Sequence, residues 1–132
     1  HDEPERVAEA AVRLGLKPEG GFAESPYAFT EADLLRGKAL YQSFCAICHG
    51  ARGEGDGRAI PLGVPKPRSY HDPAVRDQPE GYFYFAATNG FGRMLPYKSR
   101  IPERERWLIA HYIKRCLLSE ACPEEVVHAE VH

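Results

Sequence analysis

The sequence predicts an all-α fold in which helices are joined by one long irregular segment. Three stretches begin with helix-start signals: Thr30 before acidic residues, Asp77 before a Pro-Glu pair, and Pro102 before an apolar run. Residues 61–73 contain four prolines, which forbid a helix there and predict a stiff, extended segment. No βαβ pattern is present, so helices are expected to form the whole framework.

The first thirty residues are expected to form an extension to the main domain. Residues 4–14 predict a short helix, because apolar side chains recur at helical spacing after a proline. Glycines and a proline end this helix, and the following stretch has no period. We therefore expect an extended arm that is attached to the domain by Phe22, Tyr27 and Phe29.

A second helix is predicted from Thr30 to Cys45. Thr30 is the expected N-cap, and the acidic residues that follow suit the positive end of a helix. Gly37 lies in the middle of this helix, where glycine costs about 1 kcal/mol relative to alanine. A close approach of another helix at Gly37 would explain that cost.

The residues at the end of this helix, Cys45-Ala46-Ile47-Cys48-His49, form the C-x-x-C-H signature of covalent c-type haem attachment. Two thiols about one helical turn apart can add to the two vinyl groups of one haem, and His49 then becomes the proximal iron ligand. A thioredoxin-like redox pair would be expected inside a βαβ pattern, which is missing. A structural zinc site needs two further ligands, and only Cys116 and Cys122 could supply thiolates.

The chain after His49 is rich in glycine over residues 50–57. It follows a helix and lacks a Gly-Lys-Ser/Thr ending, so it is not a phosphate-binding loop. We expect it to pass close to the edge of the haem with unusual backbone angles. Two more helices are predicted beyond it, one from Asp77 to Asn89-Gly90 and one from Pro102 to about Leu118.

Met94 is the only methionine in the chain and the preferred second axial ligand. It lies between the last two predicted helices, and a thioether on the open face of the iron would complete a His/Met pair. The alternatives are a methionine that fills a gap in the core, or ligation by His71 or His111 instead.

The sequence also offers groups around the predicted ligands. The second ring nitrogen of His49 needs a hydrogen-bond acceptor, and the carbonyl of Pro61, or failing that Pro65, could serve. The candidate donors to the haem propionates are Arg52, Arg68, Arg93 and Trp107.

Cys116 and Cys122 lie close together near the end of the last predicted helix. In an oxidising compartment this spacing favours a disulfide that attaches the tail to the helix, and two free buried thiols are the alternative.

Composition and charge are those of a soluble globular domain. The 132 residues are 43% hydrophobic and 27% charged, and no apolar run of about 18 residues could span a membrane. Residues 34–115 carry fourteen basic and seven acidic side chains, while both ends are acidic. Such a distribution steers partners or is ordinary solvated surface. The sequence shows no signal peptide. Because covalent haem attachment is associated with export across the inner membrane, we expect a processed or truncated chain whose native N-terminus carried a signal peptide or a lipid anchor.

Residues 31–118 resemble class I cytochrome c in the order of helix, C-x-x-C-H, irregular segment, helix, methionine loop and helix. Gly37 and Tyr41, opposite Ile109 and Tyr112, are similar to the helix crossing of that family. A narrower resemblance is to the mono-haem cytochrome subunit of bacterial alternative complex III, a quinol-oxidising membrane assembly. It rests on residues 53–57, 63–70, 89–92, Met94 and 106–110. Leu95 separates Met94 from Pro96 where that family has Met-Pro directly.

These observations predict three parts: an extension at 1–30, a cytochrome c domain at 31–118 and an acidic tail at 119–132. The expected function is single-electron transfer through one haem c attached at Cys45 and Cys48, without enzyme activity of its own. The resemblance implies a subunit of, or a partner to, a quinol-oxidising respiratory complex that passes electrons toward a terminal oxidase. It implies redox-protein partners, no nucleic acid, and a periplasmic site or the outer face of the inner membrane. A free or oxidase-associated shuttle is the alternative, with a haem sensor or peroxidase, or a zinc-stabilised binding module, more remote.

Overall fold

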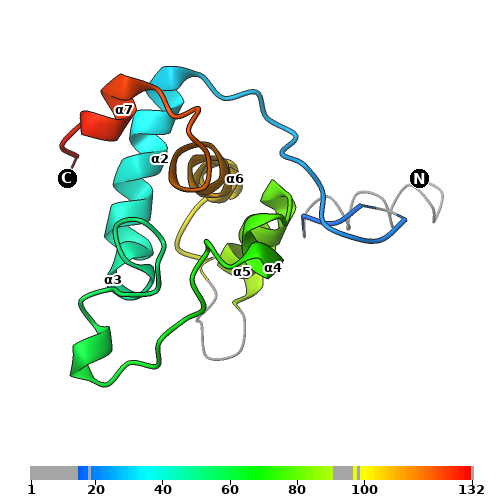
Figure 1. Ribbon diagram of the computed structural model, residues 1–132. Helices are drawn as coiled ribbons and strands as arrows, with labels where there is room; N and C mark the ends of the chain where they lie inside the picture. Colours follow the sequence, from blue (N-terminus) through cyan, green and yellow to red (C-terminus); the bar gives the residue numbers. More distant parts are fainter. Residues whose placement is uncertain (1–14, 18, 91–96, 98, 132) are drawn as a thin grey trace.

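The computed structural model describes residues 15–17, 19–90, 97 and 99–131. Every element in the described part of the chain is helical, and the only strand-like pairing there is an isolated bridge between Leu16 and Phe22 (Figure 1). The all-α prediction is therefore confirmed. The helix predicted over residues 4–14 lies outside the described residues.

Two crossing helices form the centre of the domain, α2 (Glu31–Phe44) and α6 (Glu103–Tyr112). They cross at Gly37, where an added Cβ atom would lie 3.1 Å from Cβ of Tyr112 and 3.2 Å from Cγ of Leu108. The rings of Tyr41 and Tyr112 extend the contact, with centroids 5.6 Å apart. The predicted close approach at Gly37 is confirmed.

The start of α2 follows the cap signal in the sequence. The hydroxyl of Thr30 accepts a hydrogen bond from the Asp33 amide at 3.2 Å, and the Asp33 carboxylate accepts one from the Thr30 amide at 2.8 Å. This reciprocal capping box satisfies two amide groups that a helix start would otherwise leave without acceptors.

The middle of the chain differs from the prediction in where its helices begin. A one-turn helix, α4 (Pro73–Arg76), begins after Asp72, whose carboxylate caps it by accepting a hydrogen bond from the Ala74 amide. Pro73 suits the first position of this helix. Asp77 therefore ends α4 instead of capping the next helix. That helix, α5 (Glu80–Asn89), begins after Pro79 and ends as predicted at Gly90, which has a φ of 73°.

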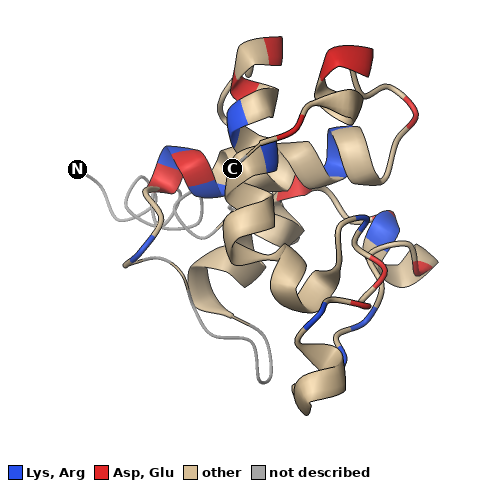
Figure 2. Cartoon of the chain, turned by 90° about the vertical axis from the view of Figure 1, so that its left-hand side faces the viewer, with Lys and Arg blue, Asp and Glu red and all other residues tan. Residues whose placement is uncertain are grey.

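The segment between His49 and α4 wraps around one side of the domain. We call residues 50–57 the glycine loop and residues 58–72 the wrap. The wrap contains one turn of 3₁₀ helix, η1 (Ile60–Leu62), which the prediction of a wholly extended segment missed. Leu62 at the end of this turn is 84% exposed, and Figure 2 shows basic positions along the same segment.

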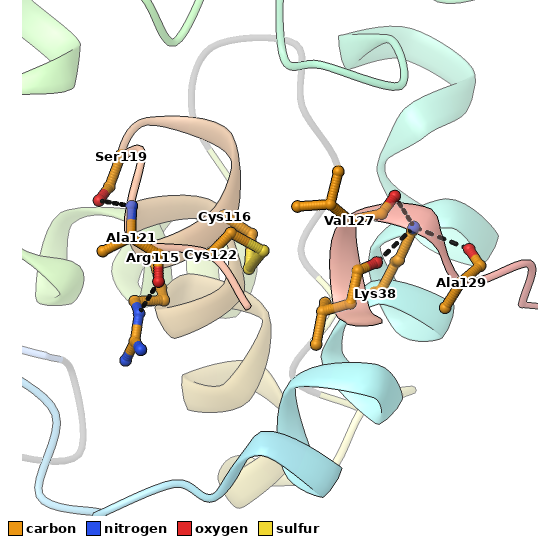
Figure 3. The surroundings of a disulfide bond; sticks show 9 residues. Lys38, Arg115, Cys116, Ser119, Ala121, Cys122, Val127 and Ala129 are labelled. Atoms are coloured by element: carbon orange, nitrogen blue, oxygen red, sulfur yellow. Dashed lines mark hydrogen bonds between the residues drawn. A yellow bond between two sulfur atoms is a disulfide. The ribbon is translucent and has the colours of Figure 1, made fainter. Parts of the chain in front are cut away.

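The C-terminal tail is joined to the last helix by a disulfide and to α2 by the buried side chain of Lys38. Beyond Tyr112 the helix widens into the π-helical segment η2 (Ile113–Leu117), and the predicted tail contains a further helix, α7 (Glu124–His128). The structure joins Cys116 and Cys122 in a disulfide, and Lys38 of α2 points into the end of α7 (Figure 3). The Lys38 ammonium donates to the carbonyls of Val126, Val127 and Ala129 at 2.7, 2.9 and 2.8 Å.

The arm before α2 packs against α5 and α6 through its aromatic residues. Phe22 meets Tyr82 and Phe85 edge-on, at centroid distances of 5.3 and 5.8 Å, and Phe29 lies 5.3 Å from the ring of His111. The predicted attachment of the arm by Phe22 and Phe29 is confirmed, and so is that by Tyr27, whose hydroxyl donates to the carboxylate of Glu103 on α6. No helix in the described residues is long and apolar enough to cross a membrane.

Candidate haem site

The C-x-x-C-H residues occupy a turn and a short helix at the end of α2. Cys45 caps α2, and α3 (Ala46–His49) follows directly. The amides of Cys48 and His49 donate to the Cys45 carbonyl at 3.2 and 2.9 Å. One helical turn therefore holds the two thiols and the imidazole together, as covalent attachment requires.

The glycine loop fixes the backbone of this turn from outside. The amides of Gly55 and Gly57 donate to the carbonyls of His49 and Cys48, at 2.8 and 3.1 Å. A Cβ atom on Gly57 would clash with the carbonyl of Ile47, so the chain can approach this closely only with glycine. The hydroxyl of Tyr41, on α2, donates to the Gly50 carbonyl at 2.7 Å and anchors the start of the loop.

A cavity of about 220 Å³ opens beside Cys45 and His49. Its other walls are apolar faces of α5 and α6, together with residues of the wrap and of α4. The lining residues are Cys45, His49, Pro67, Arg68, Tyr70, Val75, Tyr82, Phe83, Ala86, Ala87, Ile109 and Ile113. A flat apolar group attached at Cys45 would thus lie against aliphatic and aromatic side chains, with Arg68 as the one Lys, Arg, Asp or Glu side chain among these lining residues.

His49 is half-buried, and its imidazole is neutral at physiological pH. Loss of solvation on burial lowers the pKa of its imidazole to about 4, so the ring keeps the lone pair that a metal ligand needs. Its Nδ1 atom is buried and makes no hydrogen bond in the described part of the chain. The hydrogen bond predicted from His49 to the carbonyl of Pro61, or of Pro65, is therefore not formed in this structure.

The two cysteines of the motif differ in their surroundings. Both are free thiols here; Cys45 is only 7% exposed, while Cys48 is half-buried. Burial raises the pKa of the Cys45 thiol to about 12. Neither thiol belongs to a group of three or more His, Cys, Asp or Glu side chains that could hold a metal ion, within the described residues. Cys116 and Cys122, which a zinc site would need, are bonded to each other.

The candidate propionate donors separate into three groups. Arg68 lines the cavity and lies 3.6 Å from the carboxylate of Asp72. Arg52 is exposed, and the cavity lining includes neither it nor Trp107. Trp107 is fully buried and stacks on Tyr84 at 4.0 Å, with its indole nitrogen lacking a hydrogen-bond partner in the described chain. Arg93 lies outside the described residues.

The candidates for the second axial ligand are also separated by the structure. Nδ1 of His111 lies 2.5 Å from the carboxylate of Glu80, and Nε2 of His71 lies 2.8 Å from the Arg52 carbonyl. Both imidazoles thus have partners away from the cavity lining. Met94 lies outside the described residues, so it stays a prediction.

Two aromatic residues of the site were not singled out from the sequence. Tyr70, in the wrap, stacks on His49 with centroids 4.7 Å apart and an interplanar angle of 15°. Phe83, on α5, meets the Tyr70 ring edge-on at 5.4 Å. No motif or spacing in the sequence placed Tyr70 beside the histidine.

Comparison with known proteins identifies the family. The sequence profile described as "Cytochrome C oxidase, cbb3-type, subunit III" matches residues 32–113, which is more than half of the chain. The chain belongs to this family of cytochrome c domains. Covalently bound haem c and the role of an electron carrier follow from that membership, and the residues described above fit such a group. No curated protein sequence matches the chain.

Two solved structures are similar to this cytochrome. One, from the "Kuenenia stuttgartiensis reducing HAO-like protein complex Kustc0457/Kustc0458", shares 27% identity over 73% of this chain, with a TM-score of 0.59. This cytochrome covers 48% of that chain, about half of its length. The other, "KustC0563 c-type cytochrome", shares 21% identity over 59% of this chain and 93% of that chain, with a TM-score of 0.49.

Proposed function

We propose that this cytochrome transfers single electrons between redox proteins, with Cys45 and Cys48 as the haem attachment sites and His49 as the proximal ligand. The observation that carries the proposal is the cavity itself, where Cys45 and His49 meet the apolar faces of α5 and α6. When bound there, haem c supplies the one-electron iron couple. Met94 is the proposed second ligand, and its thioether would raise the reduction potential.

The protein residues hold this site dry and rigid. Phe83 is 4% exposed and Ile109 2% exposed, so these walls keep water from the cavity side of His49. A low-dielectric environment of this kind disfavours the more highly charged iron and adds to the effect of a thioether ligand. Since desolvation lowers the pKa of the His49 imidazole to about 4, ligation does not first require removal of a proton at neutral pH.

The surface of the wrap is the proposed docking site for a redox partner. Arg58, Lys66 and Arg68 of the wrap are exposed, as is Arg52 of the adjoining glycine loop, and the exposed apolar side chains of Leu62 and Val64 lie among them in the sequence. Positive charge of this kind favours encounter with an acidic partner surface, while the apolar side chains add contact area once the two proteins meet.

The physiological setting that we propose is a bacterial respiratory chain on the outer face of the inner membrane. The resemblance of residues 53–57, 63–70 and 106–110 to the mono-haem subunit of alternative complex III supports a place in, or beside, a quinol-oxidising complex. The family profile, described for a cytochrome oxidase subunit, supports instead an oxidase-associated cytochrome or a shuttle. In both cases the partners are redox proteins.

A spectrum tests the proposed haem ligation, and a purification tests the proposed membership of a respiratory complex. The reduced-minus-oxidised spectrum is expected to show the sharp band of a c-type haem. Met94→Ala should abolish the weak sulfur-to-iron charge-transfer band of the oxidised protein, and Leu95→Ala, which keeps the thioether, should retain it. Rapid binding of carbon monoxide to the reduced wild type would contradict six-coordinate electron transfer and favour a sensor or peroxidase.

The purification separates complex from shuttle. Native protein extracted from membranes with mild detergent is expected to co-purify with quinol-oxidising subunits. Recovery of the cytochrome by itself, with unchanged haem content, would contradict the subunit assignment and favour the shuttle.

A further inference from the structure

The orientation of the His49 ring has a specific cause in this structure. A metal-bound histidine is ordinarily oriented by a hydrogen bond from its other ring nitrogen. Here Nδ1 of His49 is buried and makes no hydrogen bond in the described chain. What lies against the ring is the phenol of Tyr70, nearly parallel to it at an angle of 15° and with centroids 4.7 Å apart.

Tyr70 is itself held in place from two directions. Its amide donates to the Gly53 carbonyl at 2.7 Å, which ties the wrap to the glycine loop. Its ring lies directly over Gly53, where a Cβ atom would run into it, and Phe83 contacts the ring edge-on at 5.4 Å. The position of the phenol is therefore fixed by the loop below it and by α5 beside it.

A fixed ring that stacks on an imidazole limits the rotation of that imidazole. Turning the His49 ring about its Cβ–Cγ bond would drive its edge into the Tyr70 ring, because stacked rings at this distance are already in van der Waals contact. In a low-spin ferric haem, the direction of the axial imidazole plane determines how the iron d orbitals split. That direction is read directly by magnetic spectroscopy.

We propose that Tyr70 is the positioning residue for His49, setting the plane of the imidazole by stacking where a hydrogen bond from Nδ1 is missing. The proposal rests on the proposed ligation of iron by His49. It assigns to the wrap a role in the electronic structure of the site, beyond that of covering it. The aromatic ring carries this role, and the hydroxyl of Tyr70 is not needed for it.

Three variants test the proposal in the haem-loaded protein. Tyr70→Phe keeps the ring, Tyr70→Leu removes it, and Tyr112→Leu removes a buried tyrosine from the helix crossing as a control for lost packing. Tyr70→Leu is expected to change the g-value anisotropy of the oxidised protein and the order of its haem-methyl NMR shifts. Tyr70→Phe and Tyr112→Leu should both keep the wild-type pattern, even where Tyr112→Leu lowers stability.

A measurement on the wild type covers the case in which Tyr70→Leu does not load haem. In the reduced, diamagnetic protein, nuclear Overhauser contacts are expected between the ring protons of Tyr70 and His49. Their absence would overturn the proposal, as would a wild-type pattern of g values and methyl shifts in Tyr70→Leu. A wild type without the c-type band would instead overturn the proposed function.

Discussion

Buried polar groups differ in their hydrogen bonding between two sides of the domain: the helix-crossing side, where α6 meets α2, and the cavity side beside Cys45 and His49. On the side of α2 and α7, the Lys38 ammonium is only 8% exposed but donates to three carbonyls. On the cavity side, Nδ1 of His49 is buried without a partner. The buried Lys38 ammonium is thus satisfied by carbonyls of the protein itself, whereas the buried Nδ1 atom of His49 has no partner in the described chain.

The two sides also differ in backbone. The crossing is made of regular helices with a capped start and a covalent link near the end. The cavity side is made of the glycine loop and the wrap, which are held mainly by single backbone hydrogen bonds to α3 and to each other. Regions with few internal contacts have low local stability. Loss of haem should therefore affect the two sides unequally.

The largest expected effect comes from removing the attachment cysteines. Cys45→Ser/Cys48→Ser should abolish covalent haem, seen as the loss of haem stain after denaturing electrophoresis. Amide hydrogen exchange should then become fast in residues 53–70, while α2 and α6 keep more protection than the wrap. Cys116→Ser/Cys122→Ser is the matched control, and it should retain the haem stain. If Cys45→Ser/Cys48→Ser lost amide-exchange protection equally in residues 53–70 and in α2 and α6, the proposed difference in local stability would be wrong.

A smaller effect is expected from the buried lysine. Lys38→Met keeps the aliphatic stem but leaves three carbonyls at the end of α7 without their donor, and we expect unfolding to become easier by about 2 kcal/mol. Denaturant unfolding of the haem-loaded protein measures this change. The control is Lys114→Met, which removes a single hydrogen bond to the Arg76 carbonyl. The spectrum of the site should stay unchanged, since an altered spectrum would mean that the two sides are coupled.

The smallest effect is expected from charges on the wrap. Arg58→Glu/Lys66→Glu should slow electron transfer to an acidic redox partner several-fold at low salt, and the difference should vanish at high salt because screening shortens the range of charge interactions. Stopped-flow kinetics at two ionic strengths measures it. Arg36→Glu/Arg104→Glu changes exposed arginines on α2 and α6 and should have less effect. An equal slowing in the control would mean that net charge matters and that the docking position does not.

The helix-crossing side could be predicted from the sequence because its signals are local. Thr30 followed by acidic residues predicts the N-cap of α2 directly. A glycine inside a helix destabilises it, so Gly37 already indicated that another helix passes close to this position. The α4 helix was missed because four nearby prolines suggested extended chain, although proline is suited to a first turn such as that at Pro73. In α7 only five residues are helical, too few for a periodic pattern to appear.

The cavity side could be predicted only in part, because its contacts join distant segments. The spacing of Cys45, Cys48 and His49 predicted one turn of helix, and the structure has it. The carbonyl of Pro61, or of Pro65, was expected to accept a hydrogen bond from His49, whereas Nδ1 makes none in the described chain. The contact that the sequence did not predict is the stacking of Tyr70, 21 residues along the chain, on the face of the His49 ring. No periodicity or motif reports a stacking contact across an irregular segment of that length.

The burial of Cys45 has a consequence for the order of events during biogenesis. In the finished fold this thiol is only 7% exposed, behind the wrap and beside α6. An attachment enzyme needs access to the sulfur atom, and the wrap residues that line the cavity beside it restrict that access. We therefore expect thioether formation at Cys45 to precede closure of the wrap. The chain thus folds around a cofactor that it already carries.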